Sequence, residues 1–302
     1  MELRQLRYFV ETADCLNFSE AARNLFVSQS SLSEQVKKLE EEIGRPLFVR
    51  SSRGVSLTDA GIILLEHARA TLRHADACAE VVRENKSELS GDLYVGVTYS
   101  FSGILAASLS TFIKMCPNVR LHVLYAPNEQ LSELLQQRKI DLALAYQNNR
   151  HDNVQSEVLF VDNLCAIMRR DHPLAERKGL KLVDLKGYPL ILPTDTLQSR
   201  RVLDKELLRS RIQLPYRYEV SDANFLLEMV GQGRYVTVLS GGMVHRHNTL
   251  KALPLSFSDN EVYGCIHWLR DDYLKRSARL LIDMLKDNAQ VKLIRHMHPL
   301  YR

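Results

Sequence analysis

The sequence predicts a mixed α/β protein in three parts: a helical head with a β hairpin, one long helix and a two-lobed α/β region. Two helical patterns separated by a tight break, followed by a hairpin pattern, predict the head in residues 1–58. A helical pattern without proline continues through residues 59–88. Strand and helix patterns then alternate over residues 89–302, as in a parallel sheet covered by helices.

The composition is ordinary for a soluble protein, with 45% apolar residues, 25% charged residues and a formal net charge of +4. At 302 residues, the chain is long enough for two or three domains with their own cores. It has no run of eighteen apolar residues and does not open with a signal sequence. We therefore expect a cytoplasmic protein without a membrane partner.

The head begins with two helices that pack around a short break. Ala21 and Ala22 are small enough to let another helix cross closely, and Ser19 is expected to cap this first helix. Ser28 is the natural N-cap of the second helix, and Gly44 is its C-terminal stop. Apolar residues at spacings of four, three and four form its buried stripe: Leu32, Val36, Leu39 and Ile43.

The opposite face of the second helix carries polar side chains near its N-terminus. Gln29 could form two hydrogen bonds to adenine, serine hydroxyls suit either kind of base, and a glutamate could accept from cytosine. Lysines farther along the helix are better placed for phosphates. The alternative is an ordinary solvated helix face. The predicted base readers are Gln29, Ser30, Ser33 and Glu34, and the predicted phosphate contacts on this helix are Lys37 and Lys38.

Two short apolar segments after Gly44, residues 47–50 and 55–57, are joined by a turn that contains Gly54. A hairpin in this position is a wing, so the head is predicted to be a winged helix-turn-helix. Arg50 and Arg53 on the wing would reach phosphates or the minor groove.

About the first sixty residues resemble the DNA-binding domain of the LysR-type transcriptional regulators. The resemblance implies a sequence-specific partner, double-stranded DNA, with RNA polymerase as a further candidate partner and no cofactor. Ser30 stands where the family often has proline, which could shift the base preference. The matching residues are Leu6, Phe9, Phe18, Ser19, Ala21, Ala22, Leu25, Ser28, Gln29, Ser33, Leu39, Glu40, Gly44, Leu47, Phe48, Arg50, Leu57, Thr58, Ala60 and Gly61.

The charge of the head is unusual for a DNA-binding domain. Residues 1–60 contain eight Lys or Arg and nine Asp or Glu, so their net charge is −1. A bulk basic patch, the usual footprint of a DNA-binding protein, is therefore absent from the sequence of this segment. Binding of one head should be weak, and several heads on one site would be needed.

The long helix is expected to be capped by Thr58 and to run to about residue 88. About 30 residues span about 45 Å, too long for one small domain to cover. Small and apolar residues recur at heptad spacing, which favours a partner helix, and the resemblance implies the same. The alternative is that this seam, which opens at Gly61 and ends at Val82, packs on its own domain. The predicted contacts of a homodimer, assembling to a homotetramer, are Leu65, Ala68, Leu72, Ala75 and Ala79.

The second half reads as two successive α/β lobes. The expected strands are 92–97, 119–126, 141–146, 163–169, 190–192, 216–220, 237–239 and 263–269, and the expected helices are 101–115, 129–138, 199–211, 224–232 and 273–286. Two such lobes joined by crossing segments resemble the periplasmic-binding-protein-like effector domain of the same family. Lobe I would comprise about 91–161 and 269–302, lobe II about 162–268, and the crossings would lie near 160–163 and 264–268.

Ligands of open α/β sheets bind beyond the carboxyl ends of the strands, where helix N-termini point their N–H groups. Hydroxyl side chains at these ends favour an anionic small-molecule effector. The alternative is that each hydroxyl is only a helix cap. The predicted effector contacts are Ser100, Phe101, Ser102, Asn128, Tyr146, Thr194, Thr196, Ser199 and Ser221.

The cysteines and the absence of common catalytic motifs in the sequence bear on three other kinds of function: metal binding, redox sensing and catalysis. The five cysteines are an odd number without a C-x-x-C pair, so neither a disulfide framework nor a metal site is predicted. One alternative is a regulator that senses oxidation through Cys165 or Cys265. Another is a solute-binding or enzymatic α/β protein, but the sequence has no G-x-S-x-G, H-E-x-x-H or Walker motif and no identifiable nucleophile and base. We therefore do not expect an enzyme.

Overall fold

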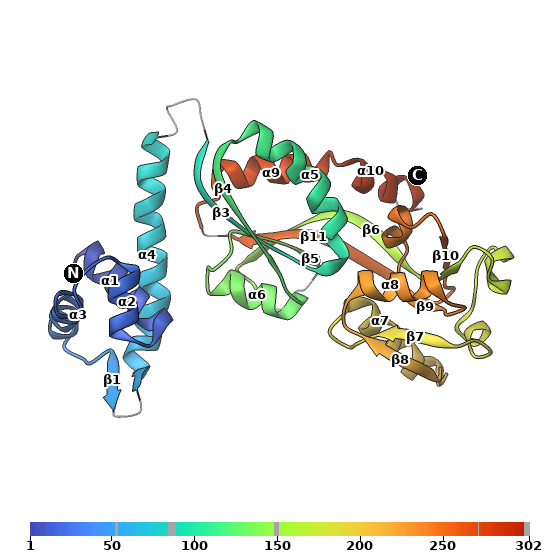
Figure 1. Ribbon diagram of the computed structural model, residues 1–302, viewed down its shortest axis with the longest axis horizontal. Coiled ribbons are helices and arrows are strands. Elements are labelled where there is room, and N and C mark those ends of the chain that lie inside the picture. The colour runs from blue at the N-terminus through green and yellow to red at the C-terminus, as the bar shows by residue number, and fades with distance from the viewer. Residues whose placement is uncertain (52–53, 84–88, 148–150, 271, 299–302) are drawn as a thin grey trace. The chain divides into compact units, whose positions relative to one another are not determined.

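The computed structural model in Figure 1 describes residues 1–51, 54–83, 89–147, 151–270 and 272–298. The chain divides into two compact units, residues 1–87 and 88–302, which are described separately. Within the described ranges, no helix combines the length and the apolar character that crossing a membrane requires.

The first unit is a winged helix-turn-helix followed by a long helix, which confirms the predicted head. Its helices pack around a small core in which Phe9, Leu32, Leu39 and Leu47 are fully buried. The first helix, α1, was not assigned from the sequence. The elements are α1 (Leu3–Cys15), α2 (Phe18–Asn24), α3 (Gln29–Ile43), β1 (Phe48–Ser51), β2 (Gly54–Leu57) and α4 (Asp59–Arg83).

Most of the predicted helix ends are confirmed. Ser28 Oγ accepts a hydrogen bond from the Ser31 N–H at 3.2 Å, and Gly44 ends α3 with a φ of 75°. Thr58 Oγ1 accepts from the Gly61 N–H at 3.0 Å at the start of α4.

Two expectations about these helices are wrong. The cap of α2 is Asn17 rather than Ser19, because Asn17 Oδ1 accepts from the Ser19 and Glu20 N–H groups at 2.9 and 3.2 Å. The apolar stripe of α3 ends at Leu39, because Ile43 is 37% exposed.

The first half of α4 packs on its own unit, which corrects the predicted dimer seam. Ala68 and Leu72 are 1% and 9% exposed and belong to the core formed with α1, against which Leu65 also packs. A Cβ atom at Gly61 would lie 2.2 Å from the Leu47 carbonyl oxygen. Ala68 and Leu72 are therefore occupied by contacts with the head, and Leu65 is partly covered by it. Ala75 is half-buried, whereas the side chain of Ala79 and the expected helix end at residue 88 lie outside the described residues.

The second unit is built on one curled sheet of seven strands with the order β10-β6-β11-β5-β3-β4, and β9 also pairs with β6. Parallel pairing of β3 with both β4 and β5 confirms the predicted β-α-β-α-β arrangement. The strands of this sheet are β3 (Ser90–Val97), β4 (Asn118–Tyr125), β5 (Leu142–Tyr146), β6 (Val154–Arg169), β9 (Thr237–Ser240), β10 (Leu250–Pro254) and β11 (Glu261–Leu269).

A separate parallel pair, β7 (Leu190–Pro193) and β8 (Tyr216–Val220), completes the second lobe. Strand β10 and helix α10 were not predicted. The helices of the unit are α5 (Ser102–Met115), α6 (Asn128–Gln136), α7 (Gln198–Ser210), α8 (Ala223–Gln232), α9 (Arg276–Lys286) and α10 (Ala289–Met297).

The two lobes are joined by β6 and β11. Residues 154–163 of β6 pair with β11, and the next residues pair with β9 and β10, so β6 leaves the first lobe where the first crossing is expected. The second crossing precedes the expected segment 264–268. Residues Gly264–His267 already pair with β5 of the first lobe, so β11 crosses at about 261–263.

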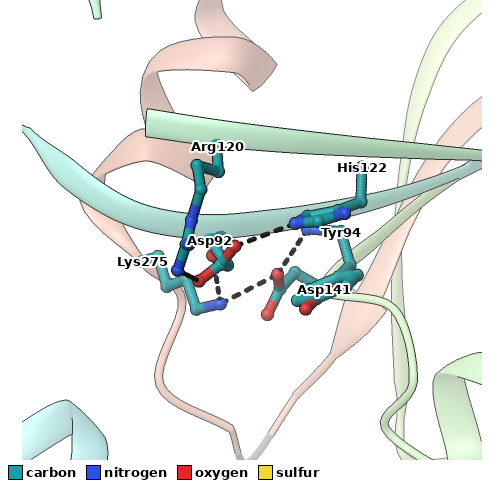
Figure 2. A network of polar contacts seen from close by, with 6 residues as sticks. All are labelled: Asp92, Tyr94, Arg120, His122, Asp141 and Lys275. Atoms are coloured by element: carbon teal, nitrogen blue, oxygen red, sulfur yellow. Dashed lines mark hydrogen bonds and ion pairs between the residues drawn. The ribbon is translucent and has the colours of Figure 1, made fainter. Parts of the chain in front are cut away.

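Figure 2 shows the polar network that ties the segment before α9 to the first lobe. Lys275 Nζ donates to the Asp92 carbonyl oxygen at 2.7 Å and to Asp141 Oδ2 at 2.9 Å. The Asp92 carboxylate accepts from His122 and from Arg120, each at 2.8 Å, and the His122 hydrogen bond is the main cause of its lowered pKa. The network holds the returning end of the chain against β3, beside α5.

Candidate nucleic-acid interface and ligand pocket

The N-terminal half of α3 presents a polar surface. Gln29 and Ser30 are exposed, and Ser33 is partly exposed. Gln29 Oε1 accepts from Ser19 Oγ at 3.1 Å, and Ser30 Oγ lies 3.1 Å from Ser28 Oγ. These contacts orient the side chains without burying them. The remaining donors and acceptors are of the kind that hydrogen-bond base edges in a major groove.

Two of the other predicted contacts on α3 are paired with each other. Lys38 Nζ lies 2.9 Å from Glu34 Oε1, and Lys37 Nζ lies 3.6 Å from Glu41 Oε1. The hydrogen bond from Lys38 lowers the pKa of Glu34 and raises that of Lys38. A phosphate or a cytosine must therefore compete with an existing ion pair, although one exposed pair is a weak competitor.

Arg50 connects the wing to both helices of the motif. Its guanidinium donates to Ser33 Oγ at 3.1 Å and lies 4.3 Å from the centre of the Phe18 ring. The sequence indicated that Arg50 contacts phosphates or the minor groove but not that it joins these elements, for which the wing arginine and the aromatic residue at the start of α2 were the available signals. Arg53, the other predicted wing contact, lies outside the described residues.

A hollow opens to solvent in the second unit, at the carboxyl ends of five strands from both lobes, and its empty space is about 350 Å³ when the open solvent at its mouth is included. Five of the predicted effector residues lie together here: Ser100, Asn128, Tyr146, Thr196 and Ser221. The remaining lining residues are Thr98, Tyr99, Ala126, Pro127, Leu197 and Gln198.

The other four predicted effector residues do not line this hollow. Phe101 is fully buried and packs edge-on against the Tyr146 ring, with the ring centres 5.1 Å apart. Ser199 is also buried, in the first turn of α7. Ser102 Oγ accepts from Asn224 Nδ2 at 3.4 Å, and Thr194 Oγ1 lies 2.7 Å from the hydroxyl of Thr196. The Phe101 ring and the hydroxyls of Ser102 and Thr194 are therefore engaged within the protein. The Ser199 hydroxyl is buried without a hydrogen-bond partner among the described residues.

Asn128 and Tyr146 hold the floor of the hollow together. The Asn128 side chain donates to the Tyr146 carbonyl at 3.0 Å and accepts from the Tyr146 N–H at 3.3 Å. The Tyr146 hydroxyl hydrogen-bonds Ser100 and Ser240, and burial raises the pKa of Tyr146 to about 12. Asn128 therefore has a structural role, and Tyr146 presents a neutral phenol.

Two of the helix ends around the hollow, those of α6 and α7, are not closed by side chains. Pro127 and Leu197, the residues before α6 and α7, make no capping hydrogen bond. At α8 the cap is Asp222, whose carboxylate accepts from the Phe225 N–H at 2.7 Å, and not Ser221. The alternative that the predicted hydroxyls are merely caps is therefore not supported here. Uncapped N–H groups at α6 and α7 favour an anion.

A buried hydroxyl adds to this preference. Thr98 is 8% exposed, and its Oγ1 has no hydrogen-bond partner among the described residues. No Asp, Glu, Lys or Arg is among the described residues that line the hollow. An anion bound here would be held by neutral donors alone, in the manner of a helix N-terminus site.

In the described residues, no three His, Cys, Asp or Glu side chains are grouped so that they could hold a metal ion. Cys165 and Cys265 are buried, and burial raises the pKa of both thiols, that of Cys265 to about 12.

Both units match models of one protein family. Residues 3–62 match the helix-turn-helix domain described as "Bacterial regulatory helix-turn-helix protein, lysR family". Residues 86–290, more than half of the chain, match the "LysR substrate binding domain".

Individual proteins are similar over nearly the whole chain. The HTH-type transcriptional regulator BsdA of Bacillus subtilis (strain 168) is 28% identical over 292 residues, covering 94% of this chain and 100% of that protein. A hydrogen peroxide-inducible genes activator of Pectobacterium carotovorum subsp. carotovorum is 28% identical over 82% of both chains. A full-length OxyR variant from Pseudomonas aeruginosa aligns with a TM-score of 0.73 at 25% identity, covering 97% of this chain and 95% of that one.

Proposed function

Because the chain belongs to the LysR family of transcriptional regulators, we propose that it reads a specific DNA site through α3 and the wing and responds to a small anion bound between its lobes. As a LysR-type regulator, the chain binds DNA and carries an effector-binding domain. The family consists of transcriptional regulators and not of enzymes. The DNA partner implies that the protein works in the cytoplasm.

We assign base reading to Gln29, Ser30 and Ser33, three polar side chains near the start of α3 that no ion pair occupies among the described contacts. Arg50 is assigned to the DNA backbone beside Ser33, because it is charged and oriented by that hydroxyl and by the Phe18 ring. Glu34, Lys37 and Lys38 contribute after their ion pairs exchange for DNA contacts.

The effector proposal depends on one observation: the uncapped N-termini of α6 and α7 meet at a hollow, and none of the lining side chains that the structure describes is charged. Helix N-termini carry partial positive charge and free N–H donors. A small carboxylate supplies the matching acceptors. Binding there would favour one arrangement of the lobes, and a coupling of about 1–3 kcal/mol is enough to change promoter activity several-fold.

A thermal-shift screen of the full chain tests this proposal. We expect a small carboxylate to raise the melting temperature of the second unit by about 5–10 °C at a concentration 100 times its Kd, and the amide of the same acid to have no effect.

Thr98→Val should weaken the binding of that carboxylate about tenfold, because it removes a buried hydroxyl in the hollow. The matched control is Thr237→Val, whose hydroxyl is also buried and unpartnered among the described residues but does not line the hollow. Equal effects of the two substitutions would contradict the site.

We also propose that the regulator acts as a homodimer that assembles to a homotetramer. Among the side chains of α4 that the structure describes, the exposed large apolar ones are Ile62 and Ile63, at 59% and 64% exposure, on the face that the head does not cover. This face replaces Leu65, Ala68 and Leu72 as the proposed helix–helix contact. A head without excess positive charge needs a second head for affinity, which supports pairing. Contact with RNA polymerase would follow at the promoter.

Redox sensing is the second candidate, because one relative is named as an activator of hydrogen peroxide-inducible genes. The geometry opposes it, because a thiol must ionise to react and burial raises the pKa of Cys165 and Cys265. In a promoter reporter, the Cys165→Ser, Cys265→Ser double variant should therefore behave like the unchanged chain before and after peroxide. Loss of a peroxide response in the double variant alone would favour the redox interpretation.

A further inference from the structure

The two lobes of the second unit touch through polar side chains on helices whose first residues, or the residues just before them, line the hollow. Arg201 of α7, in the second lobe, forms an ion pair with Glu129 of α6, in the first lobe. Asn224 of α8 donates to Ser102 of α5 across the same boundary, at 3.4 Å. Glu129 directly follows the lining residue Asn128 in the sequence, and Arg201 lies one helical turn beyond Gln198. Figure 1 shows α6 and α7 as parts of different lobes.

The Arg201–Glu129 pair is built into the structure more firmly than an ordinary surface ion pair. The two side chains are 37% and 26% exposed, so both charges are partly removed from water. The Arg201 Nε donates to the Asp195 carbonyl at 2.7 Å, which orients the guanidinium toward α6. An oriented and partly desolvated pair is worth more than a freely rotating one.

The neighbouring arginine provides a contrast. Arg200 donates to Asp204 and Glu219 and to the Pro193 carbonyl, all of which belong to the second lobe. The two adjacent arginines of α7 therefore contact different lobes. Arg200 ties α7 to its own lobe, whereas Arg201 ties it to the other lobe.

We propose that Arg201 and Glu129 form a latch that holds the two lobes closed over the hollow. Because β6 and β11 both run through the boundary, the lobes can separate by bending at these strands, and such a motion must break the ion pair. The proposal rests on the proposed function, since it makes the latch the regulator of entry and exit of the effector. The paired charges also neutralise each other, so the latch leaves the anion preference to the helix N-termini.

Hydrogen exchange of the full chain without any ligand tests the latch. For each substitution, the amide exchange rate is measured in the lobe that does not carry it. Local effects of the substitution on its own helix are thereby excluded from the comparison. Arg201→Gln should make the amides of α6 exchange about three to ten times faster, and Glu129→Gln should do the same for the amides at the start of α7 and α8. The double variant should exchange no faster than the singles, because the second substitution removes nothing further.

Arg200→Gln is the matched control and should leave exchange in α6 unchanged. Unchanged α6 exchange in Arg201→Gln, or effects that multiply in the double variant, would overturn the latch. The result is independent of the carboxylate screen, since no ligand is present. If no carboxylate raises the melting temperature but hydrogen exchange changes as expected, the effector site is rejected and the latch is kept. If a carboxylate binds but hydrogen exchange does not change, only the latch is rejected.

Discussion

Gln29→Ala is expected to lower affinity for the specific DNA site about 10- to 100-fold while changing affinity for a scrambled duplex by less than about twofold. Gln29 lies in the first turn of α3, exposed, and its amide is held by a single side-chain hydrogen bond from Ser19. A side-chain amide that makes two hydrogen bonds to adenine contributes about 1–3 kcal/mol of discrimination. Footprinting of the chain's own promoter region at low salt defines the site, and fluorescence anisotropy then measures both affinities.

Lys37→Ala serves as the comparison for this experiment. Lys37 is exposed and would meet a phosphate, so its loss should weaken specific and scrambled DNA alike and reduce the salt dependence by about one ion. If Gln29→Ala weakened both duplexes equally, Gln29 would be a backbone contact and the assignment of base reading to the start of α3 would be wrong.

Gly61→Ala is expected to destabilise the first unit by about 3 kcal/mol and to abolish DNA binding, although Gly61 is not a proposed DNA contact. Alanine normally stabilises a helix relative to glycine by about 1 kcal/mol, so the expected sign is unusual. It follows from space: the new Cβ would lie 2.2 Å from the Leu47 carbonyl oxygen and 2.9 Å from the Leu57 side chain. To relieve this overlap, α4 must move away from the wing.

Circular dichroism during thermal unfolding of the full chain measures this effect, because the first unit is mostly helical. Glu66→Ala is the control on the same helix. Its side chain is exposed, so a change within about 0.5 kcal/mol is expected. An unchanged or higher melting temperature for Gly61→Ala would show that α4 does not approach the wing this closely.

Much of the fold could be predicted because its signals are local. Ser28 and Gly44 bound α3 through hydrogen bonding and a positive φ, both of which depend on the residue type. The parallel strands β3, β4 and β5 followed from alternation of strand and helix patterns. Strand β10 and the first half of β6 were missed, because their pairing depends on distant partners that a local pattern does not reveal.

The site residues show the same difference between local signals, which the sequence reveals, and packing, which it does not. The strand-end rule brought Ser100, Thr196 and Ser221 to one hollow, because the carboxyl ends of strands meet at one edge whatever their sequence. It did not predict that the Phe101 side chain is buried in the core or that the Asn128 side chain hydrogen-bonds the Tyr146 backbone. Both features depend on packing between distant segments. The periodicity of α4 gave its buried face correctly but not the identity of the surface that covers it, because a heptad seam fits a partner helix and its own domain equally well.

The shared strand β6 limits how regulators of this kind can be recombined. It is 16 residues long, and one half pairs with β11 while the other half pairs with β9 and β10. A chimera that exchanged one lobe between two regulators would interrupt this strand. Each half of β6 would then be separated from the other half, with which it forms one continuous strand. The exchangeable module is the whole unit 88–302, so a chimera with a new effector response should be joined at the boundary between residues 87 and 88.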